Sequence, residues 1–327
     1  MNRTVIISKD KTLIIKGFAI LMMIAHHCWI KEFFVKPPEI LSYYPMIKLD
    51  YGMKMCVGLF TFFVGYGFFH AKNVDARYVF RHIWRLCRKY WLILSLTILF
   101  SLIGGGKSRH IILNIPGISH EYNLANWYIY FYIYSMILLP FISSFLRKMR
   151  LYHLVMLVLI CGSLTYINTS KNIYMVAMRE CTAYTPMLLV GYYCANTKIL
   201  SNASIYIQNR WTWILIALMA FAGRCGLGSV KGLVTDVIFV PVFVIAISAI
   251  FDGFENSKTA KMLTSFGACS TMMWFIHTLP FNDATRAIFQ GSIFWTNNII
   301  VLFIVVTVLS YLFALLYNKL SLPQTKK

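Results

Sequence analysis

Ten stretches of mostly apolar residues follow one another along the 327-residue chain, most of them about as long as a bilayer is thick. A helix needs about 20 apolar residues to cross a hydrocarbon core of about 30 Å. The stretches lie at residues 13–30, 53–71, 88–104, 125–146, 152–168, 184–196, 211–227, 233–251, 263–281 and 295–317. They predict an all-α integral membrane protein, a bundle of about ten transmembrane helices.

The composition excludes a water-soluble globular protein. Hydrophobic residues make up 59% of the chain and charged residues only 13%, about half the usual charged share of about 25%. The partner that we expect for so much apolar surface is the lipid bilayer. The chain contains no long polar block or low-complexity segment, so we expect a single transmembrane domain over residues 1–327 with no appended soluble domain.

The charge of the chain is strongly positive, with 31 Lys and Arg against 11 Asp and Glu. These charges lie in short loops between apolar stretches, a pattern that reports membrane topology rather than nucleic-acid binding. With the N-terminus inside and ten crossings, 20 of the 31 basic residues fall on the inner side. We therefore expect both termini to be cytoplasmic, in a multi-pass protein of the cell membrane, with no nucleic-acid partner.

The eight cysteines form no CxxC pair and show no His/Cys metal spacing. Most lie in apolar stretches, where a reduced cysteine behaves as a small hydrophobic residue. We expect neither a disulfide framework nor a metal site.

The first apolar stretch contains a cation and a potential base on one helical face. Lys16 and His27 are 11 positions apart, which places them within about 20° of one another around a helix and about 16 Å apart along it. His26 points about 100° away from His27. An ionisable group inside a span suggests function. The alternatives are a lysine that snorkels to the interface and a histidine hydrogen-bonded within the bundle.

A second candidate base is His277, near the end of the ninth stretch. In the expected topology it lies toward the outer side, at a depth similar to that of His27. Imidazoles can serve as general bases near neutral pH. Periodicity leaves open whether the two helices touch.

A stripe of basic residues and an aromatic segment are further candidates for a binding site. Arg81, Arg85 and Arg88 are spaced four and three apart, so they share a helical face that could hold phosphates. Attraction to anionic lipid explains such a stripe equally well. Trp127 and Tyr128 begin the fourth stretch, where aromatic residues form an interfacial belt or stack on a sugar.

Four motifs in order give the chain a resemblance to the membrane acyltransferase 3 family. Lys16 to Ile20, followed by His27, resembles the family's first helix, with Lys in place of Arg. Gly58 to Phe69 resembles its Phe-Phe-x-x-Ser-Gly stretch, with Tyr66 where Ser is usual. Asn126-Trp127-Tyr128 resembles its His-Leu-Trp-Phe/Tyr segment, and Phe266 to His277 its closing Gly-x-x-Ser and histidine motif. The paired Arg-x-Arg of some members is absent.

The resemblance implies an O-acetyltransferase that moves an acyl group, usually acetyl, from cytoplasmic acetyl-CoA to a hydroxyl of a cell-envelope glycan or lipid-linked oligosaccharide. It implies catalytic roles for His27 and His277, and substrate-binding roles for Asn126, Trp127 and Tyr128. Contacts with the co-substrate would come from Lys16, Arg81, Arg85 and Arg88.

Two other functions stay open for the sequence taken alone. A transporter or flippase for a lipid-linked sugar or small solute would also have about ten spans and buried charges, although we see no internal repeat. A membrane glycan polymerase would normally carry a longer polar outer loop than residues 104–123 provide. The oligomeric state cannot be inferred from the sequence.

Overall fold

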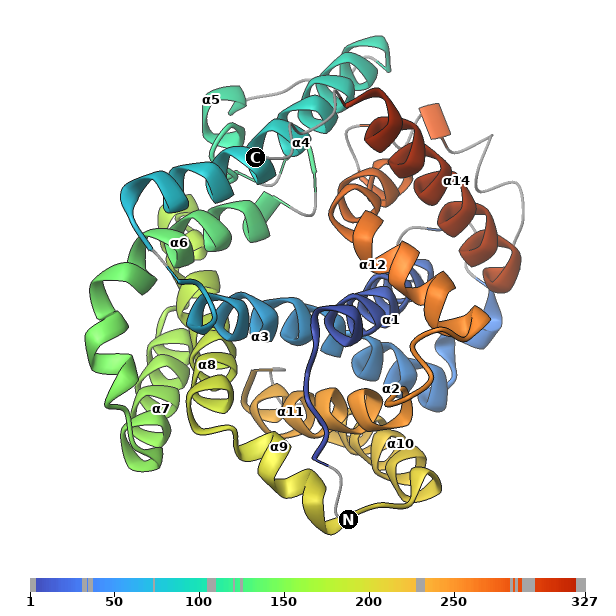
Figure 1. Cartoon of the computed structure of the whole chain (residues 1–327). Helices are drawn as coiled ribbons and strands as arrows, with labels where there is room; N and C mark the ends of the chain where they lie inside the picture. Colours follow the sequence, from blue (N-terminus) through green and yellow to red (C-terminus); the bar gives the residue numbers. More distant parts are fainter. Residues whose placement is uncertain are drawn as a thin grey trace.

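The computed structural model describes residues 4–30, 34, 38–72, 74–104, 110–119, 121–123, 126–227, 233–282, 285, 288–289 and 298–321. Within these ranges every regular element is a helix (Figure 1). The predicted all-α fold class is therefore confirmed.

A helix lies at each of the ten predicted stretches. The helices are α1 (Lys9–Cys28), α2 (Tyr44–Met53) with α3 (Met55–Phe69), α4 (Ala76–Ile103), α6 (Asn126–Arg147), α7 (Leu151–Ile167), α8 (Ile173–Thr197), α10 (Arg210–Leu227), α11 (Leu233–Ile250), α12 (Lys258–His277) and α14 (Ile299–Leu320). Short helical segments connect some of them: η2 (Glu39–Ser42), α5 (Ile111–Asn114), α9 (Ile199–Ala203), η3 (Ser204–Tyr206) and η4 (Leu279–Phe281). Residues 295–297 of the last predicted stretch lie outside the described residues.

Five helical segments in the described part of the chain are long and apolar enough to cross a membrane. They are Lys9–Cys28, Tyr44–Phe69, Ala76–Ile103, Asn126–Arg147 and Ile299–Leu320. Several such helices in one chain indicate a multi-pass membrane protein. The number of ten crossings stays a prediction.

Two helices begin well before the apolar stretches that predicted them. The Asp75 side chain accepts a hydrogen bond from the Tyr78 backbone N–H at 2.6 Å and caps α4. The Asn172 side chain accepts from the Tyr174 N–H at 3.0 Å and caps α8. Charged residues lower the hydropathy of these first turns without preventing helix formation, because capping satisfies the exposed N–H groups. The arginine stripe of α4 is therefore helical throughout.

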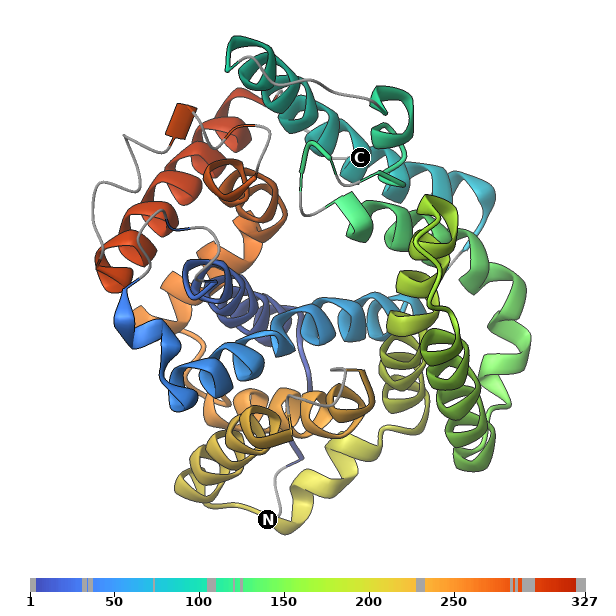
Figure 2. The same ribbon diagram turned by 180° about the vertical axis from the view of Figure 1, so that it is seen from behind.

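The central helix pair is α1 with α12, which lie side by side in Figures 1 and 2. Gly17 of α1 lies against the backbone of Leu263, and Gly267 of α12 lies against the backbone of Leu13. A Cβ atom on either glycine would overlap the neighbouring carbonyl group. Small residues at such crossings allow two helices to approach closely.

The two helices of this pair run in the same direction. Near their beginnings Lys11 forms an ion pair with Asp252, six residues before α12 starts. At their other ends His27 contacts His277. The crossing thus sets the relative depth of residues that are 250 positions apart in the chain.

The pair of α3 and α8 has the same construction. Gly65 lies against the backbone of Leu188, and Gly191 against that of Phe62. The helices α1, α3 and α12 form the centre of the molecule, and the remaining long helices surround them (Figures 1 and 2). The outer helices carry many exposed apolar side chains, including Leu159 of α7 and Leu309 of α14, as expected for surfaces that face lipid.

We predict that Gly17→Val destabilises the protein strongly, because the added side chain forces α1 away from α12. Overpacking of this kind costs about 1–3 kcal/mol or more. Gly162→Val is the matched control, since a Cβ on Gly162 of α7 meets no atom within 4 Å. Thermal unfolding in detergent, followed by tryptophan fluorescence, should show a lower Tm for Gly17→Val only. Equal Tm values for the two variants would contradict the close crossing.

Candidate functional site

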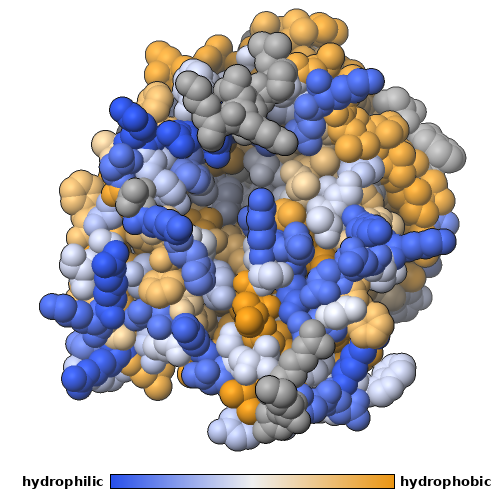
Figure 3. All heavy atoms as spheres, viewed as in Figure 1, coloured by the Kyte–Doolittle hydropathy of each residue, from blue (hydrophilic) through white to orange (hydrophobic). Residues whose placement is uncertain are grey.

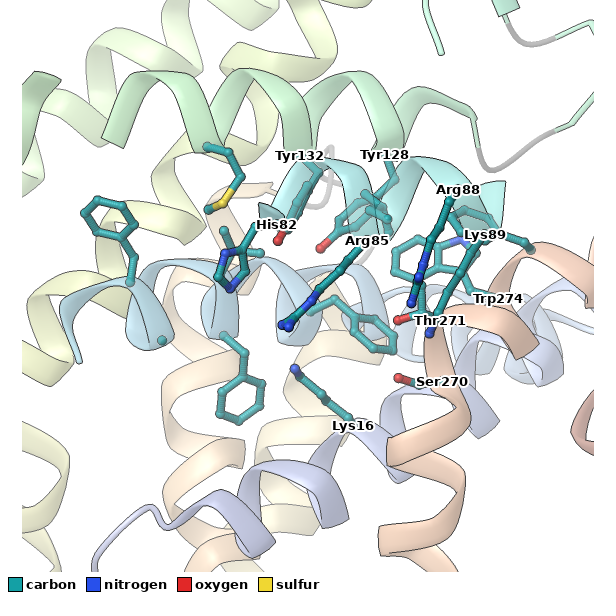
Figure 4. Close-up of a pocket in the computed structure, with 18 of the residues that line it drawn as sticks. Lys16, His82, Arg85, Arg88, Lys89, Tyr128, Tyr132, Ser270, Thr271 and Trp274 are labelled. Atoms are coloured by element: carbon teal, nitrogen blue, oxygen red, sulfur yellow. The ribbon is translucent and has the colours of Figure 1, made fainter. Parts of the chain in front are cut away.

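A cavity of about 440 Å³ lies between α1, α3, α4, α6 and α12 (Figure 4). Its size is typical of small-molecule sites. Figure 3 shows that this face of the molecule is hollowed near its centre and that hydrophilic side chains gather around the hollow. The cavity is therefore a candidate binding site in the middle of the helix bundle.

Four cations line this cavity: Lys16 from α1, and Arg85, Arg88 and Lys89 from α4. Lys16 extends from α1 toward Arg85, and the four basic side chains converge from two sides (Figure 4). No carboxylate is among the described residues that line the cavity. Within the described part of the chain, none of the four forms an ion pair.

Arg88 adds a second sign of a ligand site. Its Nε atom is buried and has no hydrogen-bond partner among the described residues. A buried charged donor without a partner is costly. Four cations without a carboxylate, one of them with an unsatisfied buried donor, define a site suited to a multiply charged anion such as a phosphate ester.

The predicted arginine stripe is only partly in the cavity wall. Arg85 and Arg88 line it, whereas Arg81 does not. Lys89 lines the cavity, although we did not single it out from the sequence. Its spacing of four and seven from Arg85 and His82 places all three on one face of α4, and that signal could have identified it.

Aromatic rings close the inner end of the cavity. Trp274 of α12 packs against Tyr128, with ring centroids 4.3 Å apart, and against Phe60 at 4.8 Å. His277 lies three residues beyond Trp274, about 4.5 Å further along the helix axis. The cavity therefore stops about one turn short of the histidine pair.

His27 and His277 contact each other directly. His27 Nδ1 lies 2.9 Å from His277 Nε2, and the two ring planes are nearly parallel, 16° apart, with centroids 4.9 Å apart. His277 Nδ1 lies 2.9 Å from the Met273 carbonyl oxygen, and its side chain is only 1% exposed. The two histidines that the sequence could not place in contact thus form one hydrogen-bonded unit.

These hydrogen bonds determine where the protons lie when both rings are neutral. A carbonyl oxygen only accepts, so His277 Nδ1 must donate to Met273 and His277 Nε2 must accept. His27 Nδ1 then donates to His277, and the lone pair of His27 lies on Nε2. This is the arrangement of a general base held in orientation by a second group.

His26, the residue before His27, has a different hydrogen-bond partner. His26 Nδ1 lies 2.5 Å from Asp50 Oδ1 on α2, and its ring centroid is 5.2 Å from that of His27. The angle of about 100° between successive residues of a helix explains why α1 can present one histidine to α12 and the next to α2.

The three residues predicted to bind the acceptor are placed in three different surroundings. Tyr128 lines the cavity. Trp127 stacks on Tyr184 of α8, with ring centroids 4.6 Å apart. Asn126 is fully buried and donates hydrogen bonds of 2.8 Å to Asn114 and to the Ser119 carbonyl, which anchor the segment around α5.

The fold and site together define a membrane-embedded helix bundle with a cation-lined cavity and a histidine pair beyond its aromatic end. A family model for an acyltransferase domain, that of the acyltransferase 3 family, matches residues 14–318. The chain belongs to this family and is a membrane acyltransferase, which sets aside the transporter and polymerase alternatives. No curated protein and no solved structure matches the chain.

We predict that both members of the histidine pair carry their proton on Nδ1, the tautomer that free histidine favours less. Solid-state ¹⁵N NMR of histidine-labelled protein in lipid should show signals of this tautomer from both rings, in addition to that of His82, whose Nδ1 donates to the Tyr78 carbonyl at 2.8 Å. The His27→Asn variant should lose one of the signals, which assigns it. A proton on Nε2 of His27 would contradict the hydrogen-bond chain from Met273.

Proposed function

We propose that the protein transfers an acetyl group from cytoplasmic acetyl-CoA to a hydroxyl of a cell-envelope carbohydrate. The observation that carries this proposal is the hydrogen-bonded pair of His27 and His277 near a cavity where all charged side chains among the described lining residues are cations. The first feature suits proton transfer and the second suits a phosphate-bearing donor.

The donor's phosphates would bind to Lys16, Arg85, Arg88 and Lys89. Arginine matches phosphate oxygens with two parallel donors, and lysine adds a compact charge. From Lys16 to His27 the rise along α1 is about 16 Å, a distance that the extended pantetheine arm of CoA would cover. The thioester would then pass the Trp274 cluster and reach the histidine pair.

In the chemical step, His27 Nε2 removes the proton of the acceptor hydroxyl as the hydroxyl oxygen attacks the thioester carbonyl carbon. The C–S bond breaks, the new C–O ester bond remains, and the thiolate of CoA takes the proton from His27. His277 keeps the His27 ring in orientation through the 2.9 Å hydrogen bond. In a two-step variant, His27 Nε2 would itself carry the acyl group as an acyl-imidazole before the acceptor attacks.

The proposed direction of transfer follows from the topology. The pairs α1 with α12 and α3 with α8 join spans one and nine and spans two and six. The second pair is also parallel, because Phe69 packs on Tyr192 four residues beyond the contact of Gly65 with Leu188 on both helices. Parallel packing of these pairs agrees with ten alternating crossings, because both members of each pair would cross in the same direction. With both termini cytoplasmic, the cation cavity opens toward the cytoplasm and the histidines lie in the outer half of the cell membrane.

We predict that His27→Ala lowers acetyl transfer by about 10²–10⁴-fold, the usual contribution of a general base. Membranes are incubated with radiolabelled acetyl-CoA, and label in carbohydrate is measured at matched expression. His110→Ala is the control, since its half-exposed side chain pairs with Glu121 in a connecting segment. Persistent acetylation of carbohydrate by His27→Ala would exclude both of the roles given to His27.

The double variant Arg85→Ala/Arg88→Ala should weaken CoA binding by about 10-fold or more, because each charge-assisted hydrogen bond contributes about 1.5–3 kcal/mol. Acceptor preference should stay as in the wild type. Arg81→Ala removes a cation from the same helix but from outside the cavity wall, and we expect little change in its Kd. Binding is measured by calorimetry in detergent. An equal loss in both variants would assign the effect to general surface charge instead of the cavity.

A further inference from the structure

Two apolar cavities lie on the lipid-facing side of the molecule, and one of them reaches the histidine pair. A cavity of about 390 Å³ lies between α4, α12 and α14, and His277 forms part of its wall. Another of about 320 Å³ follows along the same two outer helices. Phe313 of α14 lines both. We call these two neighbouring cavities together the α4–α14 seam.

The seam is apolar and faces outward. Apart from His277 and Ser310, the side chains of its outer part are hydrocarbon or aromatic, such as Leu96 of α4 and Leu309 of α14. Leu309 is 51% exposed, and Leu99, on the adjoining face of α4, is 50% exposed. Both α4 and α14 pack on α12, so α12 forms the floor of the seam. A molecule can therefore enter from the side, through lipid.

The length and apolar lining of the seam suit a long hydrocarbon chain. From Val306 to Leu320 it follows α14 for 14 residues, a rise of about 21 Å against a hydrocarbon core of about 30 Å. An acetyl group needs only a small part of this space. A long hydrocarbon chain would fill it and bury apolar surface along both helices.

We propose that the α4–α14 seam binds the hydrocarbon chain of a lipid-linked acceptor and so presents the acceptor's headgroup to His27 and His277. This inference rests on the proposed acyl transfer and adds a binding site that selects one of the possible acceptors: a glycan still attached to its membrane lipid. The donor would reach the histidines through the cation cavity and the acceptor through the seam. The two substrates then meet on opposite sides of α12, at its last turn.

The test blocks the seam with a large side chain and measures where radiolabelled acetyl groups are incorporated. Leu309→Trp places an indole in the groove, and Leu159→Trp puts the same side chain on the exposed lipid-facing surface of α7. Membranes receive a short pulse of radiolabelled acetyl-CoA and are separated into chloroform–methanol-extractable glycolipid and residual polymer. In wild-type membranes the label should enter the extractable glycolipid first. Leu309→Trp should slow this entry by about tenfold, with CoA binding unchanged, and Leu159→Trp should behave as wild type.

Label that enters polymer but never extractable glycolipid would overturn the seam proposal and leave the acyl-transfer function standing. So would equal rates for the two tryptophan variants, or a change in Leu309→Trp confined to the preferred acyl-chain length of the donor. No label in any carbohydrate would instead refute the proposed function. Should Leu309→Trp lose CoA binding through misfolding, Leu96→Trp on the opposite wall repeats the test.

Discussion

The close parallel crossing of α1 and α12 is the constraint on which the rest of the structure depends. Gly17 and Gly267 let the two backbones meet, and at their far ends the helices hold His27 Nδ1 2.9 Å from His277 Nε2. The same pair supplies Lys16 to the cation cavity and Trp274 to its aromatic end. A shift of one helix along the other would therefore separate the two histidines and, at the same time, move Lys16 relative to Trp274 in the cavity wall.

Charge pairing distinguishes the cations that support the fold from those that we propose bind a ligand. Arg224 and Asp236, both buried, pair at 2.5 Å between α10 and α11, and Lys11 pairs with Asp252. Buried charges that only support a fold need such partners, because desolvation is costly. The four cations of the cavity form no ion pair among the described residues, which is why we assign their counter-charge to a substrate. Family membership supplies the acyl chemistry.

The sequence predicted what depends on spacing within one helix. Helical arithmetic placed Lys16 and His27 on one face and separated His26, which pairs with Asp50. It could not show that His27 meets His277, because that contact joins residues 250 positions apart. Nor could it show that Trp127 turns to Tyr184, since an aromatic belt and an aromatic core give the same pattern. The spacing of Lys89 shows which residues share its face of α4. Only the packing of α4 against the other helices shows that this face lines the cavity.

The central claim is that one path through the bundle connects a donor on one side of the membrane with an acceptor reached from the other. Sealed inverted vesicles carrying the protein test it directly when radiolabelled acetyl-CoA is supplied only outside, at the former cytoplasmic face. The account predicts acetylated carbohydrate that resists an impermeant esterase added outside and loses its label once detergent opens the vesicles. Label that the esterase removes from intact vesicles would contradict it.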